Sequence, residues 1–454
     1  MLKKLLVANR GEIAVRIIRA AKDLGIATVA VYSAADADAL HVQLADESVN
    51  IGPPAAKKSY LSTEALLKAA ADTRCDSVHP GYGFLAENAD FSDAVKNAGL
   101  VFVGPSGDAI RLMGDKVSAR VAAARAGVPV VPGSEGRVNG IESARAILEE
   151  TGFPVMIKAA AGGGGRGIRI ANSQAEFEQA FPQAEAEALA AFGDGGLYME
   201  KVIGKARHIE VQVLADGTDA IHCYERECSL QRRRQKVWEE APSCALSDAL
   251  REELCASAIA LAKAVHYSGA GTVEYLYDDE ADRFYFIEMN TRIQVEHPVT
   301  EAITGIDLVA EMLRIAGGEK LRLKQSDIAV KGHAIEVRLC AEDPAKDFAP
   351  FPGKVDDLRI PGGPGVRFDS MLFSGYQVPP FYDSLLAKLI VHGDTREAAI
   401  DRLIRALGEL QIGGLKTTKP LFVALAADPS VRAGEVHTRW LESWLTENAA
   451  ALAN

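Results

Sequence analysis

Cysteine, long apolar runs and excess positive charge are all scarce in this sequence of 454 residues. The six cysteines are scattered without a C-x-x-C pair, so neither a disulfide framework nor a structural zinc site is expected. Free thiols are typical of a reducing compartment, and we expect a cytoplasmic protein. No apolar run approaches the length that spans a bilayer. A net charge of −12 disfavours general binding to nucleic acid or anionic membranes.

The N-terminal region alternates strand and helix patterns over residues 1 to about 113. It begins with a strand at Leu5–Ala8 and a helix from Glu12 to Leu24, which Gly25 ends. Repeated alternation predicts a parallel, doubly wound α/β sheet. The first turn reads Asn9–Glu12 in place of G-x-G-x-x-G, which argues against a nicotinamide-dependent oxidoreductase.

A glycine-rich loop separates two strand-like segments, Phe153–Lys158 and Gly167–Ile170. Four consecutive glycines, Gly162–Gly165, cannot form a helix or a stable strand interior. Their backbone N–H groups are free to contact an anion, with Lys158 and Arg166 alongside. We expect a mobile flap over phosphate groups. A flexible linker is the alternative, which is less favoured because linkers rarely lie between two apolar strands of a compact unit.

The stretch Phe284–Pro298 predicts a strand with an unusually polar face. Strand side chains alternate, so Glu288 and Asn290 share one face while Ile287 and Met289 take the other. A solvated edge strand is the alternative interpretation. The polar residues that follow keep the first parity only if the chain stays extended: Arg292, Gln294 and Glu296.

A second carboxylate is expected beside this strand. Gly271–Tyr277 also reads as a strand, and Asp278–Arg283 has the length of a hairpin connection. Pairing would place Glu274 opposite Glu288, which is destabilising for two like charges. A hard cation between the two carboxylates would remove that cost, and Mg²⁺ is commonly held by one or two carboxylates plus substrate phosphates. The pattern therefore predicts a divalent metal site.

Three further segments place polar groups on strands or beside them. His208 shares a strand face with Glu210, which favours a phosphate or ribose role for the imidazole. The basic run Ser229–Lys236 is typical of a solvated loop, but in an acidic protein we expect it to meet anions. Gly332–Cys340 alternates and places Ala334, Glu336 and Arg338 on one face.

In their order along the chain, these segments resemble biotin carboxylase, a family of the ATP-grasp superfamily. The resemblance covers nearly the whole sequence and is carried by six motifs: Ala8–Ala14, His79–Asn88, Met113–Lys116, Ile157–Gly167, Phe286–Glu301 and Gly332–Arg338. It implies an α/β ATP-grasp fold in three parts. These are an N-terminal Rossmann-like domain (1–115), an ATP-grasp domain (116–330) with a mobile glycine-rich lid at about 132–203, and a C-terminal β-rich domain (331–447).

The resemblance also implies a reaction. Biotin would be carboxylated with bicarbonate through carboxyphosphate, giving N-carboxybiotin, ADP and phosphate, as the first half-reaction of acetyl-CoA carboxylase or another acyl-CoA carboxylase. ATP and Mg²⁺ or Mn²⁺ would be required. The sequence has no Met-Lys-Met biotinylation motif, so biotin is expected on a separate biotin carboxyl carrier protein. Carboxyltransferase subunits are further expected partners, as is a homodimer with Arg16 and Arg19 near its interface.

Site residues carried over by the resemblance fall into four groups. Nucleotide contacts would come from Lys116, Lys158, Gly162, Gly163, Gly164, Gly165, Arg166, Gly167, Glu200, Lys201, His208, Gln231 and Leu276. The metal would be held by Glu274, Glu288 and Asn290. Bicarbonate would be bound by Lys236, Arg292, Gln294, Val295 and Glu296, with Glu296 as general base. Arg338 would face the biotin ureido group, whose developing oxyanion needs a permanent cation.

Two positions depart from the family pattern. Arg234 stands where the family usually has His, and Thr417–Thr418 replaces a usual Thr-Asn pair. Three alternatives stay open besides the oxidoreductase: an ATP-grasp ligase that joins a carboxylate to an amine, the carboxylase subunit of a pyruvate-type carboxylase, and a non-catalytic nucleotide-sensing subunit.

Overall fold

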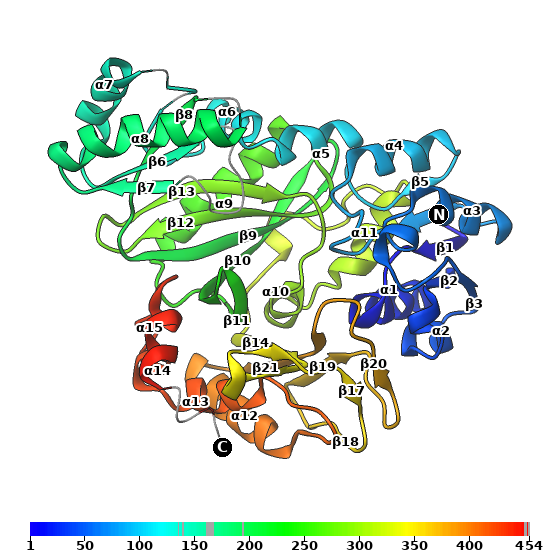
Figure 1. The fold of residues 1–454 in the computed structure, drawn as a ribbon. Coiled ribbons are helices and arrows are strands. Elements are labelled where there is room, and N and C mark those ends of the chain that lie inside the picture. Colours follow the sequence, from blue (N-terminus) through cyan, green and yellow to red (C-terminus); the bar gives the residue numbers. More distant parts are fainter. Residues whose placement is uncertain (135, 139, 160–167, 193–194, 449–451, 453–454) are drawn as a thin grey trace.

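The computed structural model describes the chain except residues 135, 139, 160–167, 193–194, 449–451 and 453–454. The predicted glycine flap, Gly162–Gly167 with Arg166, lies outside the described residues. Figure 1 shows an N-terminal body, a small upper lobe, and a large sheet that reaches the C-terminal part.

The N-terminal body is built on a five-stranded parallel sheet with the order β3-β2-β1-β4-β5. Its strands are β1 Lys4–Val7, β2 Ala27–Tyr32, β3 Glu47–Asn50, β4 Ser77–His79 and β5 Val101–Phe102. Its helices are α1 Gly11–Asp23, α2 Leu40–Leu44, α3 Thr63–Asp72, α4 Ala89–Asn97 and α5 Gly107–Gly114.

Both faces of this sheet are covered, because successive strand residues pack on opposite sides. Leu5 packs with Ile17 of α1, whereas Leu6 packs in a separate core with Leu66 of α3 and Phe91 of α4. The predicted doubly wound sheet is confirmed.

The upper lobe in Figure 1 is a three-stranded antiparallel sheet with the order β7-β6-β8, covered by two helices. The elements of this region are α6 Lys116–Arg125, α7 Ile141–Thr151, β6 Val155–Ala159, β7 Ile168–Ala171, α8 Gln174–Phe192 and β8 Leu197–Lys201. Phe177 and Phe181 of α8 are fully buried against the sheet. The two strands predicted to flank the glycine loop are therefore confirmed, and they pair with each other.

An eight-stranded sheet forms the floor of the molecule, with the order β13-β12-β9-β10-β11-β14-β21-β19. Its strands are β9 Ala206–Asp216, β10 Ala220–Arg232, β11 Gln235–Ala241, β12 Ser268–Asp278, β13 Arg283–Asn290, β14 His333–Cys340, β19 Val366–Ser370 and β21 Leu385–Gly393. The sheet crosses the domain boundary predicted at residue 330, because β11 pairs with β14.

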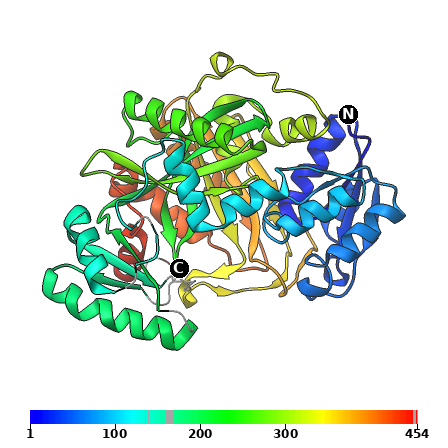
Figure 2. The ribbon, with the colours of Figure 1, turned by 90° about the horizontal axis from the view of Figure 1, so that it is seen from above.

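Helices from several parts of the chain pack around this sheet (Figure 2). They are α9 Asp248–Ala264, α10 His297–Thr304, α11 Leu308–Ala316, α12 Arg396–Glu409, α13 Lys419–Ala427, α14 Pro429–Ala433 and α15 Trp440–Glu447. Short strands complete the C-terminal part: β15 Glu342–Asp343, β16 Ala349–Pro350, β17 Gly353–Lys354, β18 Leu358–Arg359, β20 Gln377–Val378 and β22 Gln411–Ile412. Within the described residues, no helix combines the length and apolar character needed to cross a bilayer.

Two local features are settled by the structure. The basic run Ser229–Lys236 is a tight hairpin between β10 and β11, with the exposed Arg233 and Arg234 at its turn. The strand β13 ends at Asn290, so the condition that the chain stays extended through Glu296 is not met. The following segment leads into α10, where Pro298 lies in the first turn, a position that suits proline.

A buried ion pair holds the first turn of the N-terminal body. The Arg10 Nε and Nη2 atoms each lie 2.7 Å from an Asp36 carboxylate oxygen, and the Tyr60 hydroxyl donates to Asp36 at 2.6 Å. Both partners of the ion pair are buried. Breaking such a pair leaves a charge without compensation in the interior.

We expect Asp36→Ala to lower the free energy of unfolding by about 3–5 kcal/mol, because Arg10 would remain buried and unpaired. Chemical denaturation followed by circular dichroism measures the loss. Asp38→Ala, two residues away and exposed, is the matched control and should change stability by less than about 0.5 kcal/mol. Equal effects of the two substitutions would contradict the assigned role.

Candidate active site

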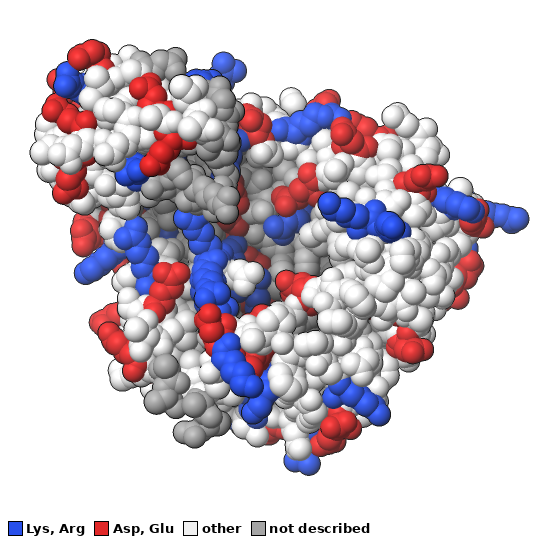
Figure 3. Space-filling model, in the orientation of Figure 1, with Lys and Arg blue, Asp and Glu red and all other residues white. Residues whose placement is uncertain are grey.

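One cleft of about 1820 Å³ lies where the three parts of the molecule meet. It is lined by the first turn of the N-terminal body, by β6 and β8 of the lobe, and by the large sheet with its C-terminal extension. Figure 3 shows the hollow beneath the upper lobe, with Lys and Arg side chains gathered along it. Basic residues that line the cleft include Arg10, Lys116, Lys158, Arg234, Lys236, Arg292 and Arg338.

The predicted pairing of the two carboxylates is confirmed. Glu274 of β12 lies directly opposite Glu288 of β13. A register shift between Glu274 and Tyr275 leaves Ile287 as an extra residue on β13. Ile287 is consequently 37% exposed and lines the cleft, so its expected place on the core face is wrong. Met289 is buried as predicted.

The geometry around these carboxylates fits a hard cation. Burial and the neighbouring Glu274 charge raise the pKa of Glu288 above its usual value, although Lys116 opposes the shift. The amide nitrogen of Asn290 donates to Glu274 at 2.8 Å, and its oxygen accepts from Arg292 at 3.1 Å. Carboxylate and amide oxygens are the ligands that Mg²⁺ prefers. A bound cation would relieve the repulsion between Glu274 and Glu288.

A second group of possible metal ligands, His208, Glu210 and Glu274, lies close together on β9 and β12. This group already has a cation beside it, because the Lys236 ammonium contacts both of its carboxylates. Among the described residues, Glu288 forms no ion pair with this group.

Lys236 is the centre of the charged network. Its Nζ atom lies 2.5 Å from Glu210, 2.8 Å from Glu274 and 2.7 Å from Glu296. Burial alone would lower the pKa of this lysine, but the three carboxylates hold it well above its usual value. Lys236 enters the cleft from β11, directly after the hairpin turn where Arg233 and Arg234 adopt left-handed φ angles of 49° and 66°.

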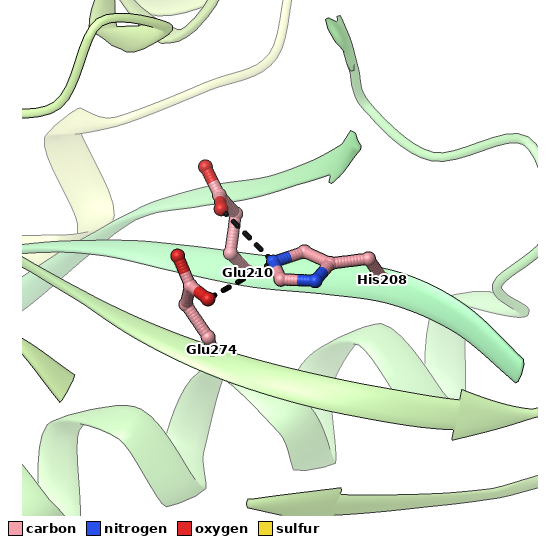
Figure 4. Close-up of side chains that lie close together, drawn as sticks. All are labelled: His208, Glu210 and Glu274. Carbon is pink, nitrogen blue, oxygen red and sulfur yellow. Dashed lines mark ion pairs between the residues drawn. The ribbon is translucent and has the colours of Figure 1, made fainter. Parts of the chain in front are cut away.

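His208 lies between two of the same carboxylates (Figure 4). Its Nε2 atom is 3.4 Å from Glu210 and 3.2 Å from Glu274. Burial would lower the pKa of His208, but the two carboxylates, with Glu274 the stronger, raise it to about 9. The imidazole is therefore a cation at neutral pH, which suits the predicted phosphate contact.

Arg226 forms hydrogen bonds to this cluster, and no role was predicted for it. It is fully buried, and its guanidinium donates to Glu210 at 2.7 Å and to Gln294 at 2.8 Å. Further bonds reach Gln212, Thr272 and Thr300. No pattern identified in the sequence pointed to Arg226, whose partners lie up to 74 residues away.

The segment predicted to bind bicarbonate is irregular, yet its side chains meet in the cleft. Arg292 donates to Glu87 at 2.8 Å, and Gln294 donates to Glu274 at 2.8 Å. The carbonyl oxygen of Val295 accepts from the buried Lys388 at 2.8 Å. Arg292, Gln294, Val295 and Glu296 all line the cleft. This segment is therefore positioned by tertiary contacts, and not by regular strand pairing.

Arg338 of β14 reaches the same place from the C-terminal part. Its guanidinium lies 3.0 Å from Glu296 and 2.6 Å from Glu239. Thr418 holds the backbone here, because its hydroxyl donates to the Arg338 carbonyl at 2.9 Å and accepts from the Cys340 N–H at 3.0 Å. The family departure at Thr417–Thr418 thus includes a residue with a structural role.

Among the described residues, those predicted to contact the nucleotide are at the cleft except Lys201. Lys116, Lys158, Glu200, Gln231 and Leu276 line it. Lys158 forms an ion pair with Glu200 across β6 and β8. Lys201 is exposed and does not line the cleft, and its backbone N–H donates to Pro132 at 2.8 Å. The family departure Arg234 also lies at the cleft edge.

Three further cleft residues, Asn9, Glu12 and Tyr82, had no predicted role. The Tyr82 hydroxyl donates to the buried Glu12 carboxylate, and both residues line the cleft. Asn9 fixes the loop that carries Tyr82, because its amide donates to the carbonyls of Pro80 and Tyr82 at 2.7 Å. Gly81 adopts a φ of +64° against Asn9, which leaves no room for a side chain. The sequence showed the motifs that contain these residues, but it did not show the contacts between them.

Family models match almost the whole chain. The biotin carboxylase N-terminal domain covers residues 1–110, the ATP-binding domain of carbamoyl-phosphate synthase L chain covers 115–324, and the biotin carboxylase C-terminal domain covers 336–443. Biotin carboxylase 1 of Bacillus subtilis (strain 168) is 53% identical over 98% of this chain and 99% of that protein.

This chain belongs to the biotin carboxylase family. The predicted family and its ATP-grasp fold are confirmed, and the family consists of ATP-dependent ligases. Other relatives include the biotin carboxylase of Haemophilus influenzae at 53% identity, covering 99% of this chain and all of that one. A pyruvate carboxylase subunit of Methanothermobacter thermautotrophicus is 48% identical and covers 98% of this chain and 90% of that one.

Solved structures of biotin carboxylases agree with the fold. A Campylobacter jejuni biotin carboxylase, described as a complex with β,γ-ATP, has a TM-score of 0.89 at 46% identity, covering 98% of this chain and 99% of that one. The biotin carboxylase domain of a thermophilic 2-oxoglutarate carboxylase bound to bicarbonate has a TM-score of 0.93 at 46% identity, covering 100% and 99%.

We expect the His208 imidazole to titrate near pH 9 in protein free of metal and nucleotide. Because this pKa is above the usual 6.5, the resulting stabilisation is complete below pH 6.5 and is lost as the pH rises through about 9. NMR titration of the imidazole measures the midpoint. Glu274→Gln should lower it by at least about one pH unit.

The buried His41 of the N-terminal body is the control, since its pKa is lowered to about 4 by burial and should not respond to Glu274→Gln. A His208 midpoint near 6.5 that Glu274→Gln leaves unchanged would contradict the charge network.

Proposed function

We propose that the protein uses ATP to carboxylate biotin with bicarbonate, giving N-carboxybiotin, ADP and phosphate. The observation that carries this proposal is the meeting of Lys236 and Arg338 at one carboxylate, Glu296, with distances of 2.7 and 3.0 Å. A lysine, a base and an arginine at one point can bind a small oxyanion, deprotonate it and stabilise an adjacent oxyanion. The full-length relatives named biotin carboxylase favour this reaction over a carboxylate–amine ligase.

The nucleotide is proposed to lie between the lobe and the large sheet. Lys116, Lys158 and His208 supply positive charge for its phosphates, and Glu200, Gln231 and Leu276 line the cleft around the remainder. The family resemblance adds Lys201 and the segment 162–167 as proposed contacts. Glu274, Glu288 and Asn290 would hold Mg²⁺ or Mn²⁺. A bound metal ion would neutralise charge on the transferred phosphoryl group.

The proposed domains have the bounds 1–115, 116–330 (lid about 132–203) and 331–447.

Bicarbonate is proposed to bind at Arg292, Gln294, Val295 and Lys236. Burial would raise the pKa of Glu296, but Lys236 and Arg338 hold it below its usual value. Glu296 is therefore an ionised carboxylate that can accept the bicarbonate proton. The bicarbonate oxygen then attacks the γ-phosphorus and ADP leaves, which forms carboxyphosphate. Exclusion of water protects this intermediate from hydrolysis.

Biotin is proposed to enter beside Arg338. Carboxyphosphate breaks down to CO₂ and phosphate, the phosphate takes the proton of the biotin N1 atom, and N1 bonds to the CO₂ carbon. Negative charge on the ureido oxygen is stabilised by the permanent charge of Arg338. Biotin would be attached to a separate carrier protein, and carboxyltransferase subunits would take the carboxyl group onward.

A homodimer is also proposed, by analogy with a relative whose biotin carboxylase domain is described as a dimer. Arg19 is exposed and available for such an interface, whereas Arg16 is paired within the chain with Glu301 at 2.8 Å and Asp307 at 2.6 Å. Relatives include carboxylases named for different acceptors, pyruvate in one and 2-oxoglutarate in another.

The direct test is ADP release from ATP and Mg²⁺ with bicarbonate and free biotin. Release should require bicarbonate and increase with biotin, and the carbon of labelled bicarbonate should appear in carboxybiotin. ADP release that depends on neither substrate would exclude the proposed function.

Arg338→Ala should reduce biotin carboxylation by at least about 100-fold, because the ureido oxyanion loses its cation. ATP affinity should change little, since Arg338 lies on β14 and the proposed nucleotide residues lie elsewhere. Labelled bicarbonate incorporation and nucleotide binding measure the two effects. Arg283→Ala, an exposed arginine at the start of β13, is the control and should retain both activities. Normal carboxylation by Arg338→Ala would remove the assigned role.

A further inference from the structure

Two buried carboxylates lie on neighbouring strands beside Arg338. Glu239 of β11 and Glu336 of β14 are cross-strand partners, and neither side chain has measurable exposure. Like charges directly opposite on a sheet are destabilising, and burial removes the water that would screen them. Two ionised groups at these positions would need cations of their own.

Few hydrogen bonds compensate the negative charge of these two carboxylates. One Glu239 oxygen accepts from Arg338 at 2.6 Å, while the other has no hydrogen-bond partner among the described residues. Within the same part of the chain, neither oxygen of Glu336 has a hydrogen-bond partner. An ionised carboxylate only accepts hydrogen bonds, so two of them cannot bond to each other. A proton on one of them would supply the missing donor.

The cations near the two carboxylates already have other partners. Lys388 of β21 lies opposite Arg338, but its ammonium donates to the Val295 carbonyl at 2.8 Å and lies 3.2 Å from Glu12. Arg338 is divided between Glu239 and Glu296.

The other titratable groups packed nearby carry no positive charge that could compensate the two carboxylates. Tyr82 donates to Glu12, and its pKa is raised well above the usual value by burial and by Glu12. His297 of α10 is held neutral, because burial and the neighbouring cations Lys388, Arg16 and Arg367 lower its pKa well below the usual value. Burial also raises the pKa of Glu336 well above the usual value and that of Glu239 to about 7.

We propose that Glu239 and Glu336 share one proton and that this pair positions Arg338. The neutral Glu336 donates its O–H to the free oxygen of Glu239. Glu239 is then a single, fixed negative charge whose other oxygen holds one edge of the Arg338 guanidinium. The remaining edge is directed to Glu296 and the cleft. With both carboxylates ionised, two negative charges would draw the guanidinium away from the cleft.

The shared proton is a property of the folded protein, whereas its consequence for catalysis rests on the proposed biotin carboxylation. The two parts are tested separately. Infrared difference spectroscopy at neutral pH detects the carbonyl stretch of a protonated carboxylic acid by its shift in D₂O. The band should be present in the protein and lost in Glu336→Gln, and Glu280→Gln, an exposed glutamate in the β12–β13 turn, should keep it. Absence of the band, or its persistence in Glu336→Gln, would overturn the proposal.

Thermal unfolding gives a second measurement of the proton. A carboxyl whose native pKa is raised loses stabilisation as the pH rises above its ordinary value of 4.5. Glu336→Gln removes this titration. Its unfolding midpoint should therefore exceed that of the unchanged protein by at least about 2 °C at pH 8 and by less at pH 5. A midpoint difference that does not depend on pH would overturn the proposal.

The positioning role is tested by substitution with and without a neutral donor. Glu336→Leu removes the hydrogen bond and should lower kcat/KM for biotin by roughly tenfold. Glu336→Gln retains a donor amide and should restore most of this loss. KM for ATP should stay constant in both variants. Equal losses in the Leu and Gln variants would refute the positioning role, whereas ADP release without bicarbonate dependence in the unchanged protein would instead refute the proposed function.

Discussion

The structure of the site depends on one ammonium group surrounded by three carboxylates. Glu210, Glu274 and Glu296 come from β9, β12 and the segment before α10, and Lys236 comes from β11. Without the lysine, three buried negative charges would repel each other at close range. Without the carboxylates, a buried ammonium would lose its proton. The network is therefore stable only when all four strands and segments are in place, which makes site formation dependent on the complete fold.

Much of the site could be predicted because its residues follow local rules. The pairing of Glu274 with Glu288 follows from two alternating strands and a short connection. Strand alternation likewise predicted the common face of His208 and Glu210. The family motifs then supplied roles for Arg292, Glu296 and Arg338, which periodicity alone does not assign.

Other features required the folded chain. The bulge that turns Ile287 into the cleft depends on one register shift, which no local pattern encodes. Arg226 and Lys388 have partners far away in the sequence, so a buried charge on a strand could not be matched with its acceptors in advance. Directly after β13 ends at Asn290, the chain is held by a distant residue, because the Thr291 N–H and the Arg292 guanidinium both donate to Glu87.

The continuous eight-stranded sheet has a consequence for the spacing of the reacting groups. β12, which carries Glu274, and β14, which carries Arg338, are four strand positions apart. With about 4.8 Å between neighbouring strands, this corresponds to about 19 Å measured along the sheet. The contacts Glu274–Lys236, Lys236–Glu296 and Glu296–Arg338 connect the two ends over this distance. The backbone hydrogen-bond ladder therefore fixes the length that these side chains must cover. A shorter side chain at any of these positions would interrupt the connection while the sheet itself remained intact.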